Sequence, residues 1–185
     1  MEVSILMEDV KKQILGTPLL RVLDLLLQYP NVALSDAEIN SKIEGVKRAA
    51  VHMSLTRLAG MGLISRTHQG RRCFNEIDLS NSWLQPFKLA CNMLEIEPII
   101  KLLKPHTLKI VLFGSRAEST NSFDSDFDLA VVANEPDVVQ RLAADSSMID
   151  RIQLMVKTPS EMLDLESSEP VFASKIRKGI VLWEK

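Results

Sequence analysis

Hydrophobic positions follow two different periods along this chain. Over residues 19–27 leucines recur at i, i+1, i+4, i+7 and i+8, which predicts a helix with one apolar stripe between Pro18 and Pro30. Later, continuous runs rich in apolar residues at 109–113 and 129–133 predict strands. The pattern therefore predicts a helical first part and a second part that contains a sheet.

Two more helices are expected after the first. Ser35 and Glu38 have the spacing of a capping box, which predicts a second helix that ends near Gly45. A third helix is expected over residues 47–60. Its apolar stripe leaves a mixed face toward solvent, made of Ala49, His52, Met53, Thr56 and Arg57.

A hairpin and an uneven distribution of charge follow the third helix. Residues 63–67 and 71–77 are predicted strands, joined by a tight connection at 68–70. The net charge is only −2, yet residues 45–75 hold six basic and no acidic residues, whereas residues 117–170 hold twelve acidic and three basic ones. This asymmetry favours a polyanionic partner for the first part and divalent cations for the second.

The order helix, short helix, turn, helix and hairpin resembles a winged helix-turn-helix over about residues 15–80. The segments 34–39 and 55–64 are also similar to that family. The resemblance implies binding of double-stranded DNA, with the third helix in the major groove, and such proteins commonly act as homodimers. The implied DNA-binding residues are Lys47, Arg48, His52, Thr56 and Arg57 on the helix and Arg66, Arg71 and Arg72 on the wing. Alternatively, this part dimerises or docks a protein partner, and the arginines form a solvated face.

Residues 81–104 are predicted to form a helical connector. Asn81 opens an apolar helical stretch, and Pro98 is expected to break it, because proline lacks the backbone N–H and clashes with the preceding turn. We therefore expect one helix to about Ile96 and a second, short helix before Pro105.

A pair of carboxylates lies at the start of the second strand. The strand over 109–113 leads into Gly114 and Ser115, and Asp126 and Asp128 follow further on. Residues two apart on a strand point to the same side, so the two carboxylates are expected to meet. Carboxylates beside a turn that can hold phosphates are what Mg²⁺ or Mn²⁺ needs to bridge a protein and a nucleoside triphosphate.

The segments 112–117 and 124–129, with ten residues between Ser115 and Asp126, resemble the signature of the minimal nucleotidyltransferases of the DNA polymerase β superfamily. The resemblance extends to the end of the chain. It implies an NTP substrate, ATP being expected, and transfer of a nucleoside monophosphate to a hydroxyl with release of pyrophosphate. The implied residues are Asp126 and Asp128 for catalysis and metal binding and Gly114, Ser115, Arg116 and Ser125 for nucleotide binding.

Two positions depart from that family. Ser119 stands where the family usually has glycine, and Gln153 stands where the family has its third metal-site carboxylate. An amide supplies neither negative charge nor a comparable proton acceptor. Asp150 is the nearest carboxylate along the chain, but three positions on a strand place it on the opposite face. The second metal site is therefore predicted to be incomplete.

The sequence as a whole predicts an α+β protein. We expect a winged helix-turn-helix over 1–80, a helical connector over 81–104, and a nucleotidyltransferase fold over 105–185 with a small mixed sheet flanked by helices. The leading hypothesis is a DNA-associated nucleotidyltransferase-like protein. Two alternatives stay open: a transcriptional regulator whose second domain senses nucleotides, and an antitoxin-like protein that neutralises a protein partner, which is also a candidate acceptor.

Composition and sequence patterns exclude several classes of protein and indicate the cellular location. With 46% hydrophobic and 25% charged residues, the chain is not disordered, collagen-like or a coiled coil. No apolar run approaches the roughly 20 residues that span a bilayer, and residues 1–7 lack the pattern of a secretory signal. No membrane contact and a cytoplasmic location are expected. The two cysteines and three histidines lack the spacing of a zinc site.

Overall fold

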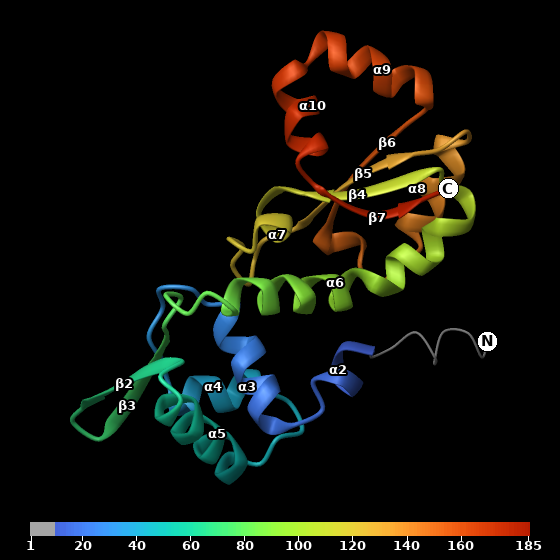
Figure 1. Cartoon of the computed structure of the whole chain (residues 1–185). Helices are drawn as coiled ribbons and strands as arrows, with labels where there is room; N and C mark the ends of the chain where they lie inside the picture. The colour runs from blue at the N-terminus through green and yellow to red at the C-terminus, as the bar shows by residue number, and fades with distance from the viewer. Residues whose placement is uncertain (1–9) are drawn as a thin grey trace. The chain divides into compact units, whose positions relative to one another are not determined.

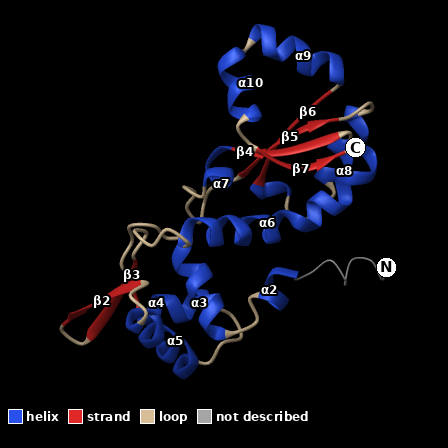
Figure 2. Cartoon of the chain, viewed as in Figure 1, coloured by secondary structure: helices blue, strands red, loops and turns tan. Residues whose placement is uncertain are grey.

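The computed structural model describes residues 10–185, and the chain divides into two compact units, Met1–Cys91 and Asn92–Lys185 (Figure 1). The residues on which the expectation about a secretory signal rests, 1–7, lie outside the described residues. No helix in the described part of the chain is long and apolar enough to cross a membrane. As Figure 2 shows, the N-terminal unit is mainly helical, whereas the C-terminal unit is built on a sheet.

The N-terminal unit contains the three helices and the hairpin that the sequence predicts. A short helix α2 and a two-residue strand β1 are additional, and the small antiparallel sheet has the order β1-β3-β2. Strand β2 continues to Gln69, so the hairpin turns at Gly70 rather than over 68–70. The elements are α2 (Val10–Ile14), α3 (Pro18–Leu27), β1 (Leu34–Ser35), α4 (Asp36–Lys42), α5 (Arg48–Gly60), β2 (Ile64–Gln69) and β3 (Arg72–Ile77).

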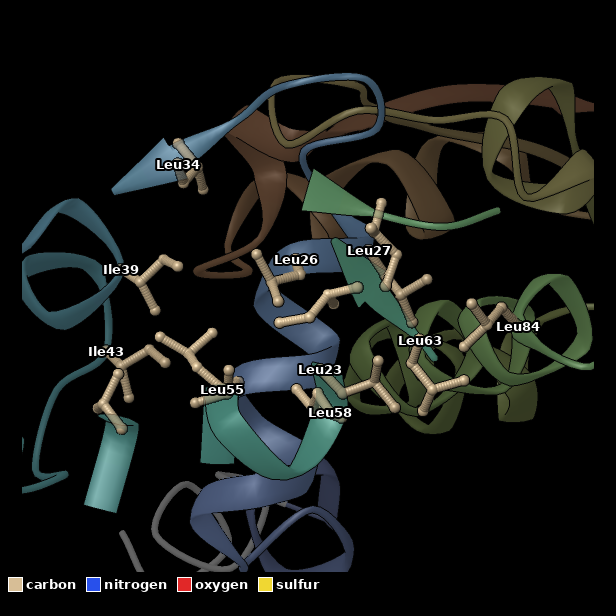
Figure 3. Packing of buried hydrophobic residues seen from close by; sticks show 14 residues of the cluster. Leu23, Leu26, Leu27, Leu34, Ile39, Ile43, Leu55, Leu58, Leu63 and Leu84 are labelled. Atoms are coloured by element: carbon tan, nitrogen blue, oxygen red, sulfur yellow. The ribbon is translucent and has the colours of Figure 1, made fainter. Parts of the chain in front are cut away.

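Local signals and packing agree in this unit. The Thr17 hydroxyl caps α3, and Ser35 and Glu38 form the predicted capping box at the start of α4. The apolar stripes of the helices then meet in one core, shown in Figure 3. Its labelled side chains are Leu23, Leu26, Leu27, Leu34, Ile39, Ile43, Leu55, Leu58, Leu63 and Leu84. Burial of these side chains fixes α5 with its predicted polar face toward solvent.

The expectation that Pro98 breaks the connector is wrong. Helix α6 runs without interruption from Leu84 to Leu103, with Pro98 inside it. Its second half buries Ile96, Ile99 and Leu103 against the sheet of the C-terminal unit. That burial outweighs the roughly 3 kcal/mol that proline costs in a helix interior.

The C-terminal unit has a four-stranded mixed sheet in the order β6-β5-β4-β7. Strands β5 and β6 are parallel, whereas β4 is antiparallel to both β5 and β7. This confirms the predicted small mixed sheet flanked by helices. The elements are β4 (Lys109–Phe113), α7 (Gly114–Glu118), β5 (Phe127–Val132), α8 (Pro136–Ala144), β6 (Ile152–Lys157), α9 (Pro159–Ser168), α10 (Pro170–Arg177) and β7 (Ile180–Glu184), with 3-10 turns at Lys104–His106 and Ile149–Arg151.

Side chains alternate between the two faces of this sheet. Leu112 of β4 and Leu129 of β5 pack in one core with α6 and α8, and Val111 and Ala130 pack in a second core with α9 and α10. Figure 1 shows the two pairs of helices on opposite sides of the strands. Because the period is two, each residue of β5 has a determined face, and this determines where its polar residues point.

Candidate active site

The two aspartates of the acidic segment lie at the beginning of β5. Phe127 packs in the core with α6 and α8, so Asp128 belongs to the opposite face of β5. Asp126 lies in the loop that leads into the strand. Asp128 is the register partner of Phe113 at the end of β4. The end of one strand and the beginning of the next therefore meet at the carboxylate pair.

The charges of these two side chains are coupled. Burial raises the pKa of the half-buried Asp128 carboxyl above its ordinary value, and the nearby charge of Asp126 raises it further. Asp126 itself is exposed to solvent. The fold thus holds two acidic groups close enough to repel each other at neutral pH, which a bound cation would relieve.

Gly114, directly after β4, leaves the space that the Asp128 carboxylate occupies. Its φ is +70°, and a Cβ at this position would collide with the carboxylate of Asp128. The sequence predicts a turn at Gly114, but in the structure Gly114 is the first residue of the short helix α7. Ser115, half-buried, is the second residue of that helix.

The backbone conformation at Ser119 shows why glycine is usual at this position in the family that the sequence resembles. Ser119 ends α7 in the left-handed conformation, with φ of 60° and ψ of 21°. This is the conformation that glycine adopts without steric cost, whereas other residues lose roughly 1–2 kcal/mol. The loop therefore keeps its conformation with serine, at some cost in stability.

Gln153 lies directly beside the carboxylate pair. It is the register partner of Asp128 on the neighbouring parallel strand β6, and its side chain is exposed. Register partners in adjacent strands point to the same face, so Gln153 occupies the position from which a third carboxylate would face the site. Asp150 is exposed and lies in the 3-10 turn before β6, not on the strand.

The side chains available to hold a cation at this site are therefore two carboxylates, those of Asp126 and Asp128. Among residues 10–185, no group of three or more His, Cys, Asp or Glu side chains is arranged to hold a metal ion. Two carboxylates with solvent access still suit Mg²⁺, because this cation retains several waters and takes one or two protein carboxylates together with substrate phosphates.

Arg116, expected at the nucleotide, lies behind the site. Its side chain is 0% exposed, and its guanidinium donates to the backbone carbonyl of Ser125. The Ser125 hydroxyl accepts a hydrogen bond of 2.9 Å from the Ser122 amide, which closes the loop before Asp126. The Arg116 side chain is therefore not accessible to a nucleotide in this structure.

Sequence reasoning missed the buried polar side chains of Asn92 and Asn121. Both are almost fully buried, and Asn92 donates to Asn121 and to the Arg116 carbonyl. The available signal was Asn92, a polar residue at a core position of the apolar stretch that forms α6. The role of Asn92 becomes clear only once the structure shows the loop that it contacts.

The basic residues of the N-terminal unit separate into two groups. Arg66 on β2 is 15% exposed and is bound by Asp36 and Thr56, and His52 also contacts Asp36. Although burial opposes it, hydrogen bonds from Asn75, His52 and Arg66 lower the pKa of Asp36. The remaining candidates have exposed side chains on α5, its N-cap and the hairpin: Lys47, Arg48, Arg57, Arg71 and Arg72.

Comparison with known families bears on the C-terminal unit. Residues 95–185 match the family model described as "Polymerase beta, Nucleotidyltransferase". The match supports a nucleotidyltransferase domain in this unit. The matched range covers α6 from Glu95, the whole mixed sheet and both aspartates. A search of curated proteins found no match to the chain. Similarity to a nucleotidyltransferase domain is consistent with a transferase and with a nucleotide substrate.

Substituting Asp126 tests the repulsion between the two carboxylates. Asp126→Asn is expected to raise the unfolding midpoint of the cation-free protein at pH 7 by roughly 1–3 °C, because it removes one of two facing charges. The pKa of Asp128 is raised in the folded state, so the wild type gains stability as pH falls through that raised pKa. The Asp126→Asn protein should gain less stability than the wild type over the same fall in pH.

Thermal unfolding at several pH values in EDTA is the measurement. Asp164→Asn, which removes an exposed charge in the middle of α9, is the matched control and should change neither quantity. An Asp126→Asn protein that is less stable than the wild type at pH 7 would contradict the assigned repulsion.

Proposed function

We propose that the C-terminal unit binds a nucleoside triphosphate together with Mg²⁺ or Mn²⁺, which Asp126 and Asp128 hold. The observation that carries this proposal is the pair of neighbouring carboxylates at the start of β5, where Asp128 packs against a backbone position that accepts only glycine. Oxygen donors of this kind fit a hard divalent cation. When bound, the cation would neutralise both carboxylates and bring the triphosphate next to them.

The nucleotide would lie against the strand-to-helix junction after β4. The absence of a side chain at Gly114 lets Asp128 lie against this junction, and the hydroxyls of the half-buried Ser115 and Ser125 can donate to phosphate oxygens. ATP is the nucleotide that we expect. The reaction is nucleotidyl transfer: an acceptor hydroxyl forms a bond to the α-phosphate, and the bond to the departing pyrophosphate breaks. A protein partner is one candidate acceptor.

Gln153 favours a second candidate function. A carboxylate in its place, beside Asp128, could hold a second cation and accept the proton of the attacking hydroxyl, and an amide can do neither. Binding of the nucleotide would persist while transfer becomes slow. The C-terminal unit would then sense nucleotides for a DNA-binding regulator.

The N-terminal unit is proposed to bind double-stranded DNA as a winged helix-turn-helix. Its element order and the exposed basic side chains of α5 and of the β2–β3 hairpin support this assignment. Arg66 is proposed to hold α5 in place through its contacts with Asp36 and Thr56, and not to bind a DNA phosphate. A homodimer and a cytoplasmic location remain part of this proposal.

Nucleotide binding is tested by thermal stability. At ATP and Mg²⁺ concentrations near 100 times Kd, the wild type should gain about 2.7 kcal/mol of stability. The double variant Asp126→Ala/Asp128→Ala should lose this gain, and ATP in EDTA or Mg²⁺ alone should produce much less of it. If no nucleotide stabilises the folded wild type, the proposed site is wrong.

Replacing Gln153 distinguishes the two candidate functions. Gln153→Asp restores the carboxylate and should raise pyrophosphate release from Mg²⁺-ATP at least about tenfold, since a positioned base contributes 10²-fold or more. Gln153→Ala, which also lacks the carboxylate, is the control and should show no increase. A folded, nucleotide-binding Gln153→Asp protein without increased turnover would contradict the view that Gln153 limits transfer.

DNA binding is tested by its dependence on salt. Arg57→Ala and Arg71→Ala should each weaken binding to a mixed-sequence duplex and reduce the log–log salt slope by about one, because each removes one phosphate contact. Lys178→Ala, an exposed cation of the C-terminal unit, is the control. Fluorescence anisotropy over a series of NaCl concentrations gives the slopes, and unchanged slopes for both arginine variants would remove the assignment.

A further inference from the structure

Arg116 is the largest fully buried polar side chain of the C-terminal unit. It projects from α7, and its guanidinium carbon lies 4.3 Å from the centroid of the Phe127 ring. Burying an arginine is costly unless its donors are satisfied and its charge is stabilised. A residue kept in such a place is expected to hold something in position.

The hydrogen bonds of Arg116 converge on the loop before β5. Nε and Nη2 both donate to the Ser125 carbonyl, at 3.1 and 2.7 Å, and Nη1 donates to Oδ1 of Asn92 at 3.1 Å. The amide of Asn92 in turn donates to the Arg116 carbonyl and to Oδ1 of Asn121, each at 3.0 Å. The loop is therefore tied to α6 and α7 through buried groups.

These contacts lie on both sides of Asp126. The Ser125 carbonyl belongs to the same planar peptide unit as the Asp126 amide, so fixing that oxygen fixes the backbone entering Asp126. The Phe127 ring, on the next residue, packs under the same guanidinium. One side chain thus holds the residue before and the residue after a proposed metal ligand.

Asp126 needs such support because its charge lies near the half-buried Asp128 carboxyl. Asp128 lies on the central strand β5 and is held by its neighbours on β4 and β6, whereas Asp126 precedes the strand and lies in a loop. Without a cation, repulsion would move the loop and not the strand.

We propose that Arg116 is a positioning residue that holds Asp126 beside Asp128 before the cation binds. This inference rests on the proposed function, since it assigns the purpose of the arrangement to cation binding. Removing the forked donation to Ser125 would let the loop relax, and the folded protein would then bind divalent cations less tightly. Substitutions of residues that orient metal ligands in this way typically cost 10- to 100-fold in affinity.

Arg116→Lys is the test variant, because lysine keeps the charge and most of the stem but cannot donate as a planar fork. Its affinity for Mn²⁺, measured from the electron paramagnetic resonance signal of free Mn²⁺, should fall about tenfold or more. Arg151→Lys is the matched control. Arg151 lies 5.9 Å from the same Phe127 ring but is 45% exposed and pairs with Glu95, so its variant should bind Mn²⁺ like the wild type.

A purely structural role for Arg116 would give a different result. The unfolding temperature of Arg116→Lys would fall, but the folded protein would bind Mn²⁺ with wild-type affinity, and that outcome overturns the inference. If the wild type itself fails to bind Mn²⁺ even with ATP present, the proposed function fails, and this inference fails with it.

Hydrogen exchange of the wild type gives a second test that does not depend on the folding of a variant. The Thr120 amide donates to the Ser115 carbonyl of α7, and the Ser122 and Ser125 amides are hydrogen-bonded within the loop. If the loop is held in advance, these amides should be protected in EDTA, and adding Mn²⁺ should change their exchange less than about twofold. Unprotected amides that become slow only with Mn²⁺ would overturn the inference, because the cation and not Arg116 would then order the loop.

Discussion

Repulsion between the carboxylates of Asp126 and Asp128 is the constraint on which the C-terminal unit depends. The pairing of strands β4 and β5 brings Asp128 against Gly114, and any side chain at position 114 would displace the Asp128 carboxylate. The loop that carries Asp126 is tied down by the buried Arg116. Proteins often accept lower stability at sites where function needs an unfavourable arrangement. A cation-binding role accounts for why two acidic groups are held together here.

The same constraint relates the site to the rest of the fold. The alternation of β5 sends Phe127 and Leu129 into the core under α6 and α8, and it thereby leaves Asp128 on the other face. Gln153 reaches that face through the parallel pairing of β5 and β6. The neutral amide beside the pair lowers the number of negative charges there, so the proposed site holds one cation well and lacks the charge for a second.

Local patterns predicted most of the secondary structure because they act over a few residues. The capping box at Ser35 and the apolar run of β4 each depend on neighbours in the sequence, and each lies where predicted. Pro98 was misjudged because burial of its helix is a tertiary effect. Arg116 was misjudged for a related reason: a basic residue beside a phosphate-binding motif resembles a ligand until its burial is known. The family match concerns residues 95–185, and the DNA-binding assignment rests on element order and exposed charge.

The most direct test of the central claim is the position of the cation. A crystal structure of the full chain with Mn²⁺ and a non-hydrolysable ATP analogue would locate the metal through its anomalous scattering. The account predicts one strong peak within coordinating distance of both aspartate carboxylates, with a triphosphate oxygen as a further ligand. A nucleotide bound elsewhere, or Mn²⁺ bound without contact to Asp126 and Asp128, would contradict it.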